Sequence, residues 1–127
     1  HNRCNINSDY AGKTFELKDP ELAAKYPNGV PFTEAGYPDF SAYAKETVKF
    51  ELPSSSALKA DTCLTGNNLH DFKLANKAMG FKETPAGYTW HHNEDMMTLQ
   101  LIPTDLHMAV RHTGGASLIR ELLTLIP

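Results

Sequence analysis

The sequence contains no long hydrophobic run, and no stretch approaches the roughly 20 apolar residues that a membrane-spanning helix requires. It also lacks the apolar segment of a secretory signal peptide, because the chain starts with mostly polar residues. We therefore expect no membrane partner. Since residue 1 is His1 rather than Met, we expect the chain to be a piece of a longer polypeptide, with any targeting signal lying upstream.

Cysteine is scarce. Cys4 and Cys63 are the two cysteines, and 59 positions separate them. Structural zinc sites use cysteines at short spacing, so this pair does not predict one. A single disulfide and two separate thiols both remain open.

The sequence has no surplus of positive charge, and its formal net charge is −3 at pH 7. Proteins that bind nucleic acid through phosphate contacts usually carry a basic surplus, so the charge alone argues against that role. If the chain does bind nucleic acid, positive charge must come from a bound metal ion, a few well-placed cations or protonated histidine.

The chain has 127 residues, 41% of them hydrophobic and 21% charged, which is typical of one folded soluble domain. The Pro- and Gly-rich stretch 26–40 predicts ordered loops held down by aromatic residues. Alternation over 47–52 predicts a strand, and 53–56 predicts a surface turn. Residues 67–79 predict a helix capped by Gly80, with Leu69, Phe72, Leu74 and Ala78 on its broad apolar side.

The C-terminal third predicts a strand, a turn, a second strand and a helix. The strands are expected at 88–91 and 98–102, joined by the turn 93–95. Thr104 suits the N-cap of a helix that runs to about His112 and stops at Gly114–Gly115. Residues 117–126 are predicted to form a last short helix or an extended tail. The fold class is therefore predicted to be α+β.

Histidine is concentrated in this third of the chain: His91, His92, His107 and His112 fall within 22 residues. Histidine is the commonest ligand of transition metals and the commonest general base near neutral pH. Cutting a phosphodiester requires a cation at the scissile phosphate and a base that activates water. The cluster therefore predicts at least one histidine that binds metal and at least one that does not.

The spacing of these residues sets conditions on the site. Adjacent strand residues point to opposite faces, so His91 and His92 can serve one site only if the strand ends or bulges there. His107 and His112 lie about 140° apart on an ideal helix and share a face poorly. Arg111 is four residues after His107, so a continuous helix would place its guanidinium beside that imidazole, ready to contact a phosphate.

The same residues resemble the WHH family of the HNH/endonuclease VII superfamily. The resemblance rests on 88–92 (Tyr-Thr-Trp-His-His), on 97–103, on His107 and on 112–115 (His-Thr-Gly-Gly). It extends upstream to 26–32, 37–40 and 75–76, and so covers most of the chain. Members of this family occur as C-terminal toxin domains of bacterial polymorphic toxins.

The resemblance implies one nuclease domain over 1–127, with a loop-rich N-terminal scaffold and a ββα-metal unit at about 88–115. It implies one divalent metal ion, Zn²⁺ or Mg²⁺ with Ni²⁺ or Mn²⁺ as alternatives. In the superfamily's usual order His91 is a metal ligand, His92 is the base and His107 is the next ligand. His112 would be a third ligand or a phosphate contact.

The superfamily pattern also has a middle Asn that orients the base, and this sequence departs from it. Asn93 comes too early, which leaves Gln100 as a substitute. Asp95 is most simply a solvated turn residue, with a supporting role at the metal as the second interpretation.

The resemblance further implies a nuclease that attacks DNA, with RNA as the alternative substrate, and that is paired with a cognate immunity protein. It would be secreted or injected as part of a larger toxin and would act in the cytoplasm of the target cell. Two other classes stay open: a binding module in which a closed zinc site only holds the fold, and another metallohydrolase. The absence of a His-Glu-x-x-His helix weakens the metalloprotease version of the latter.

Three further residues are interpreted as structural or uninvolved. Trp90 is predicted to anchor the core rather than stack on a base. His1 and His70 are predicted to lie outside the site.

Overall fold

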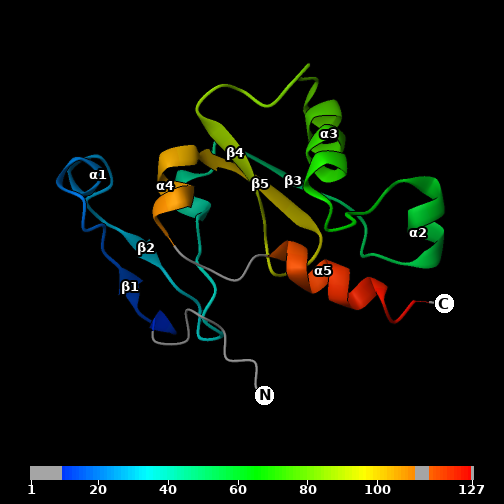
Figure 1. Ribbon diagram of the computed structural model, residues 1–127, viewed down its shortest axis with the longest axis horizontal. Coiled ribbons are helices and arrows are strands. Elements are labelled where there is room, and N and C mark those ends of the chain that lie inside the picture. Colours follow the sequence, from blue (N-terminus) through cyan, green and yellow to red (C-terminus); the bar gives the residue numbers. More distant parts are fainter. Residues whose placement is uncertain (1–9, 111–114, 127) are drawn as a thin grey trace.

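The computed structural model describes residues 10–110 and 115–126, and Figure 1 shows their arrangement. The fold mixes helices with antiparallel sheets and is α+β, as the sequence predicts. Its elements in chain order are β1 (Thr14–Phe15), α1 (Pro20–Lys25), β2 (Val30–Pro31), η2 (Ser41–Tyr43), β3 (Glu46–Lys49), α2 (Ser55–Ala60), α3 (Asn68–Met79), β4 (Tyr88–His92), β5 (Thr98–Pro103), α4 (Thr104–Ala109) and α5 (Gly115–Leu123).

The central sheet has three antiparallel strands in the order β3-β5-β4. In the β4–β5 pair, His91 lies opposite Gln100 and His92 lies opposite Leu99. The predicted strands at 88–91 and 98–102 are confirmed, and each extends one residue further. The strand predicted at 47–52 is β3, which begins one residue earlier and ends at Lys49. Because β5 is in the middle, β4 lies at the edge of the sheet.

The predicted helix at 67–79 is confirmed as α3, but its buried side differs from the prediction. The Asn67 side chain accepts a hydrogen bond from the His70 N–H, and Gly80 ends the helix in the left-handed conformation. Leu69 is 69% exposed, whereas the polar residues Asp71 and Asn76 are buried. Helix α3 therefore turns hydrogen-bonding groups toward the rest of the molecule.

The N-terminal part is rich in loops, as predicted. It contains the two-stranded sheet β1-β2 and the short helix α1, whose N-cap Asp19 accepts a hydrogen bond from the Glu21 N–H. The aromatic side chains of the stretch 26–40 hold its loops against the core, since Tyr26, Phe32 and Phe40 are all buried. The expectation of ordered, packed loops is confirmed.

Helix α2 was not expected. The sequence predicts only a surface turn at 53–56, but Ser54 is the N-cap of α2, and its hydroxyl accepts a hydrogen bond from the Ala57 N–H. A helix of six residues has too few positions to show a periodic pattern, so a run of serines resembles a loop. Cys63 follows α2 and is buried, whereas Cys4 lies outside the described residues.

The end of the chain departs from the prediction in two ways. Helix α4 begins after Pro103, so Thr104 is its first residue and not its N-cap, and it ends at Ala109 rather than near His112. Val110 has an extended backbone and stops it. Gly115 is the first residue of α5 rather than a helix stop, and α5 confirms the helical option for 117–126.

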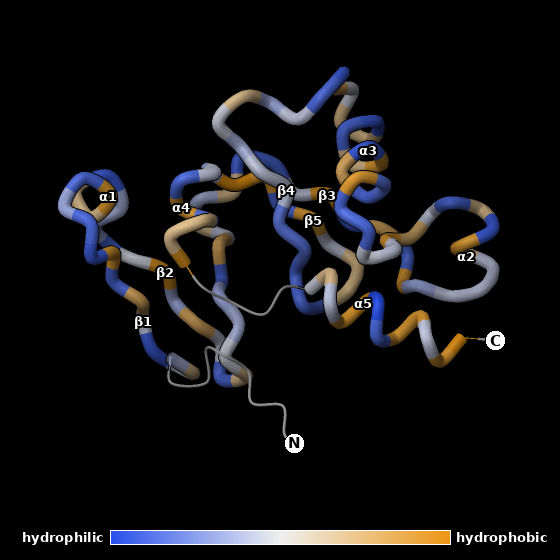
Figure 2. The backbone as a smooth tube through the Cα atoms, in the orientation of Figure 1, coloured by the Kyte–Doolittle hydropathy of each residue, from blue (hydrophilic) through white to orange (hydrophobic). Residues whose placement is uncertain are grey.

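The central sheet separates two hydrophobic cores. One contains Ile102, Leu106 and Phe40 and joins β5 and α4 to the N-terminal part. The other contains Trp90, Leu101 and Ile119 and joins β4 and β5 to α3 and α5. In Figure 1, α4 lies on the side of the N-terminal elements, whereas α3 and α5 lie on the other. In Figure 2, β5 is largely hydrophobic and the edge strand β4 is hydrophilic in colour.

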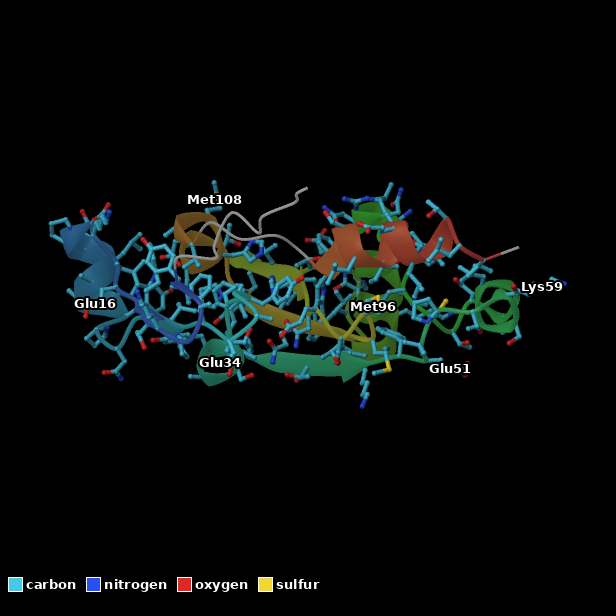
Figure 3. All side chains as sticks on the ribbon, turned by 90° about the horizontal axis from the view of Figure 1, so that it is seen from below. Glu16, Glu34, Glu51, Lys59, Met96 and Met108 are labelled. Atoms are coloured by element: carbon cyan, nitrogen blue, oxygen red, sulfur yellow. The ribbon has the colours of Figure 1, made fainter. Side chains whose placement is uncertain are left out.

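No described helix is both long enough and apolar enough to span a bilayer. The described surface still carries some exposed apolar side chains, and Met108 of α4 is 78% exposed. Figure 3 shows this side chain at the outer side of α4, away from the sheet. Single exposed apolar residues of this kind are common on soluble domains.

Candidate active site

His91 and His107 form a close pair of imidazoles. His91 projects from β4, and His107 is the fourth residue of α4, the helix that follows β5 directly. The His91 Nδ1 and His107 Nε2 atoms are 3.2 Å apart. The Phe40 ring packs against both imidazoles, with its centroid 4.9 Å from that of His91 and 5.9 Å from that of His107. The strand, the following helix and one aromatic residue thus fix the pair.

His92 lies on the opposite side of β4 from His91, as alternation along a strand requires. Its Nε2 atom is 2.8 Å from Oδ2 of Asp71, which comes from α3. The Phe72 ring is tilted against the His92 ring with centroids 5.9 Å apart. His92 is 5% exposed. The two adjacent histidines therefore contact different parts of the protein.

One cavity of about 290 Å³ nevertheless contains all three histidines. Its lining comes from β4, α3, α4 and α5, and from neither β3 nor β5. The cavity therefore lies along the outer edge of β4, where side chains from both faces of the strand can reach one space. The sequence required that the strand end or bulge at this point, and β4 does end at His92.

The His91–His107 pair fits a divalent metal ion. Zinc binds imidazole nitrogen at about 2.0–2.1 Å, so two nitrogens on one tetrahedral ion lie about 3.3–3.4 Å apart. The observed separation of 3.2 Å is close to this value. The described residues supply no third histidine, cysteine or carboxylate to the pair. His112, the predicted third ligand, lies outside the described residues.

Asp71 is the most heavily hydrogen-bonded side chain near the cavity, and it is 0% exposed. Burial opposes its ionisation, but hydrogen bonds from His92, His70 and Thr65 outweigh burial and hold the pKa of the carboxyl at about 2. The hydrogen bond to Asp71 in turn raises the pKa of His70. Asp71 is therefore an anion in direct contact with His92.

Arg120 of α5 supplies the cation that lines the cavity among the described residues. Its Nη1 donates to the Gly66 carbonyl at 2.5 Å, and its Nη2 donates to the Ser117 hydroxyl at 3.2 Å. Gly66 has φ +82°, and a Cβ there would lie 2.5 Å from Arg120 Cγ. The glycine thus permits the arginine side chain to lie flat over the loop before α3.

Arg111, the cation that the sequence favours, lies outside the described residues. The helical argument for it is wrong, because α4 ends at Ala109 and does not extend four residues beyond His107.

The other predicted site residues fall into different places. Gln100 is buried opposite His91, on the face of the sheet away from His92, and its Nε2 is 3.4 Å from Ser41 Oγ. Asp95 lies in the β4–β5 turn, where its carboxylate accepts hydrogen bonds from the Met97 and Thr98 N–H groups and from the Thr98 hydroxyl. Neither Gln100 nor Asp95 lines the cavity of the three histidines.

Trp90 is 1% exposed and anchors the core, as predicted. Its indole N–H donates to Oδ1 of Asn76 at 2.7 Å, which ties β4 to α3.

Asp71, His70 and Arg120 are the residues that sequence reasoning missed. Asp71 is 21 positions before His92, and Arg120 is 28 positions after it, so no local spacing links them. One signal was available for Asp71: an acidic residue in the first turn of a helix, within a stretch where Phe72 and Ala75 indicate burial. His70, expected to lie outside the site, contacts the carboxylate that holds His92.

Comparison with known proteins gives one family. Residues 80–121 match the model of the WHH family, described as a nuclease of the HNH/ENDO VII superfamily with conserved WHH. The match includes β4, β5 and α4 and reaches into α5, and so contains His91, His92, His107 and Arg120. Asp71 and the rest of α3 lie upstream of it. No curated protein matches the chain.

Proposed function

We propose that this chain, whose residues 80–121 match the WHH nuclease family of the HNH/ENDO VII superfamily, is a metal-dependent DNA endonuclease that acts as a toxin between bacteria. One observation carries the enzymatic part of the proposal. A single cavity joins the His91–His107 pair to His92, so that a pair of metal ligands and a candidate base face the same space. A closed structural zinc site would have no separate base beside it.

His91 and His107 are the proposed ligands of one divalent ion, with His112 as the proposed third. Imidazole suits Zn²⁺ and Ni²⁺ better than it suits Mg²⁺, which prefers oxygen ligands. The described ligand pair therefore favours a transition metal. When bound, the ion supplies positive charge that stabilises the phosphate and the leaving oxygen in the transition state.

His92 is the proposed general base. Its Nε2 atom faces the carboxylate of Asp71, so Nδ1 is the nitrogen that accepts a proton from water. The water oxygen forms a bond to phosphorus as the bond from phosphorus to the leaving oxygen breaks. The proton of the water passes to His92 Nδ1, and the leaving oxygen takes a proton from solvent.

Arg120 is the proposed phosphate contact. The chain carries a net charge of −3, so it needs local positive charge where the polyanion is cut. Two of the five guanidinium N–H groups are used in the bonds to Gly66 and Ser117, which fix the plane of the guanidinium. The remaining donors can bind phosphate oxygens.

Plasmid cleavage tests the enzymatic proposal. Wild type, His92→Ala and His107→Ala are compared with EDTA and after addition of Mg²⁺, Mn²⁺, Zn²⁺ or Ni²⁺, with circular dichroism to verify folding. We expect plasmid cleavage to require both a metal ion and His92. His107→Ala should bind metal more weakly than wild type, whereas His92→Ala should bind it as wild type does. A folded protein that cuts neither DNA nor RNA with any metal, and holds one zinc tightly, would be a structural zinc module instead.

A charge-matched pair of variants tests Arg120. Arg120→Gln removes the cation in the cavity, and Lys73→Gln removes one from the exposed side of α3, away from the cavity. We expect Arg120→Gln to lower kcat/KM by about 100-fold, since charged contacts at a developing charge contribute several kcal/mol. Lys73→Gln should change kcat/KM by less than about threefold. If both variants lowered kcat/KM equally, Arg120 would contribute only general positive charge and would not be a specific phosphate contact.

The toxin role and the preference for DNA rest on the resemblance to toxin domains of this family. In this proposal a larger protein carries the domain into the cytoplasm of a rival cell, and a cognate immunity protein protects the producer. Cytoplasmic expression in a bacterium is the direct test. Wild type should stop growth and degrade chromosomal DNA, and His92→Ala should do neither. Growth arrest with intact DNA and degraded RNA would change the substrate to RNA.

A further inference from the structure

Asp71 is a fully buried carboxylate. Charged side chains are almost never fully buried unless they are paired, because an ion loses its hydration when it leaves water. Asp71 is nonetheless 0% exposed, and both of its oxygens accept hydrogen bonds. The Thr65 N–H and hydroxyl, the Gly66 N–H, and the rings of His70 and His92 all lie within 2.8–3.1 Å of these oxygens.

The contact with Asp71 determines which nitrogen of His92 carries a proton. An ionised carboxylate can only accept hydrogen bonds, so the Nε2 atom 2.8 Å from Asp71 must be an N–H. The neutral ring then has its lone pair on Nδ1. Packing against Phe72 further restricts rotation of the ring. Asp71 thus sets both the tautomer and the orientation of the imidazole.

We propose that Asp71 is the positioning residue of this active site, and that it holds His92 in the Nε2–H tautomer with Nδ1 directed at water. The proposal rests on the assignment of His92 as the base. Asp71 acts from α3, upstream of the segment that matches the family model.

His70 supports Asp71 from the other side. Its Nδ1 is 2.8 Å from Asp71 Oδ1, and its Nε2 is 2.8 Å from Oδ1 of the exposed residue Asp61. The four side chains form a continuous line from the cavity to the surface. The line does not carry protons, because the low pKa of Asp71 keeps its carboxylate ionised. The role of His70 is to hold Asp71 in place and to share its charge.

Replacement of Asp71 by Asn should remove the negative charge that holds the Nε2–H tautomer of His92, and it should reverse the tautomer wherever the new NH₂ group faces the ring. The side chain keeps its size, but one oxygen becomes an NH₂ group. In the wild-type protein both carboxylate oxygens accept hydrogen bonds from N–H groups. Either orientation of the asparagine amide therefore places its NH₂ group against an N–H donor. When the NH₂ group faces His92, the ring must turn its lone pair toward Nε2 and its proton toward Nδ1. His92 can then no longer accept a proton at the nitrogen that faces water.

A structural role for Asp71 is the competing interpretation, since the carboxylate also caps the Thr65–Gly66 loop. Thr65→Val is the matched control, because it removes one hydroxyl donor to Asp71 on the loop side and leaves His92 in place. If Asp71 acted only through the loop, Thr65→Val and Asp71→Asn would lower stability and kcat together. Positioning predicts that only Asp71→Asn lowers kcat strongly.

The experiment measures kcat, KM, zinc affinity and the ¹⁵N spectrum of the histidine rings for wild type, Asp71→Asn, His70→Gln and Thr65→Val. We expect wild-type His92 to show the Nε2–H tautomer. Asp71→Asn should lower kcat by about 100-fold or more, with KM and zinc affinity within about threefold of wild type. His70→Gln should lower kcat by about three- to tenfold, because it loosens Asp71 without removing its charge, and Thr65→Val should lower it by less than about threefold.

A folded Asp71→Asn protein with wild-type kcat, or with an unchanged His92 spectrum, overturns the proposal. Failure of the nuclease assignment gives a different result, because wild type itself would then cut no nucleic acid. The ring spectrum would still decide whether Asp71 sets the tautomer of His92. If Asp71→Asn does not fold, His70→Gln makes the same test, because it removes the ring that contacts the other oxygen of Asp71. A His70→Gln protein with an unaltered His92 spectrum and an unaltered kcat would count against the positioning role.

Discussion

At the scale of single residues, the most consequential groups are polar side chains that the fold has removed from water. Asp71, Asn76 and Trp90 each make at least one hydrogen bond to a partner 14 or more positions away in the sequence. A buried polar group that loses its partner costs more than the bond itself is worth, because the group stays desolvated. These residues therefore give large and specific responses to substitution.

The ionisation of Asp71 makes stability depend on pH in acid. Its pKa in the folded protein is about 2, below the ordinary value of 3.8, so the charged form stabilises the fold above about pH 4. This contribution, about 2 kcal/mol, is lost as the pH falls from about 4 to about 2. Urea unfolding of wild type and Asp71→Asn across this range should show their difference shrinking by that amount. A difference in unfolding free energy that stays constant across this pH range would mean that the ionisation of Asp71 does not stabilise the fold.

Asn76 is predicted to be essential for the packing of Trp90. Asn76→Ala removes the acceptor of the buried indole N–H and should lower the free energy of unfolding by about 1–3 kcal/mol. The fluorescence of the single tryptophan reports both the unfolding midpoint and the local change. Asn28→Ala, at an exposed turn position, is the control and should cost less than about 0.5 kcal/mol.

At the scale of elements, the site depends on how α5 packs against β4. Gly115 begins α5, and a Cβ at this position would lie 2.1 Å from the Asn93 carbonyl oxygen and 2.7 Å from that of His92. The helix can lie this close to the end of β4 only because residue 115 has no side chain. This close approach brings Arg120 to the cavity wall.

Gly115→Ala should therefore push α5 away from β4. We expect a loss of about 1–3 kcal/mol in unfolding free energy and a fall in cleavage rate, because Arg120 moves with the helix. Gly80→Ala is the matched control. It introduces strain at φ +76° but no contact within 4 Å, so it should cost about 1 kcal/mol and leave the cleavage rate unchanged. Wild-type cleavage by Gly115→Ala would show that α5 does not contribute to the site.

The same scale shows what the sequence could and could not predict. Helix α3 and strands β4 and β5 were predicted because caps, turns and periodicity act within a few residues. The end of α4 was missed because the extended backbone of Val110 is buried in the core with Leu106, a tertiary effect that outweighs local helix preference. The spacing of the histidines singled out His91, His92 and His107, whereas Arg120 reaches the cavity, and Asp71 reaches His92, only through the packing of α5 and α3.

At the scale of the whole molecule, the charge predicts modest dependence on salt. Log affinity for DNA falls with log salt by about 0.9 for each phosphate neutralised. With a net charge of −3 and few cations at the cavity, we expect a slope no steeper than about −3. Fluorescence anisotropy with a labelled duplex and His92→Ala, measured at several salt concentrations, gives the slope. A steeper value would reveal a basic surface elsewhere on the chain.

The two cores of the molecule each carry half of the chemistry. His91 and His107 are held with Phe40 from the N-terminal core, whereas His92 is held by α3 from the other. The cavity that contains all three histidines therefore exists only where the side chains packed by both cores meet along β4. A substitution that loosens either core should disturb this one cavity, even when the substituted residue is far from the histidines.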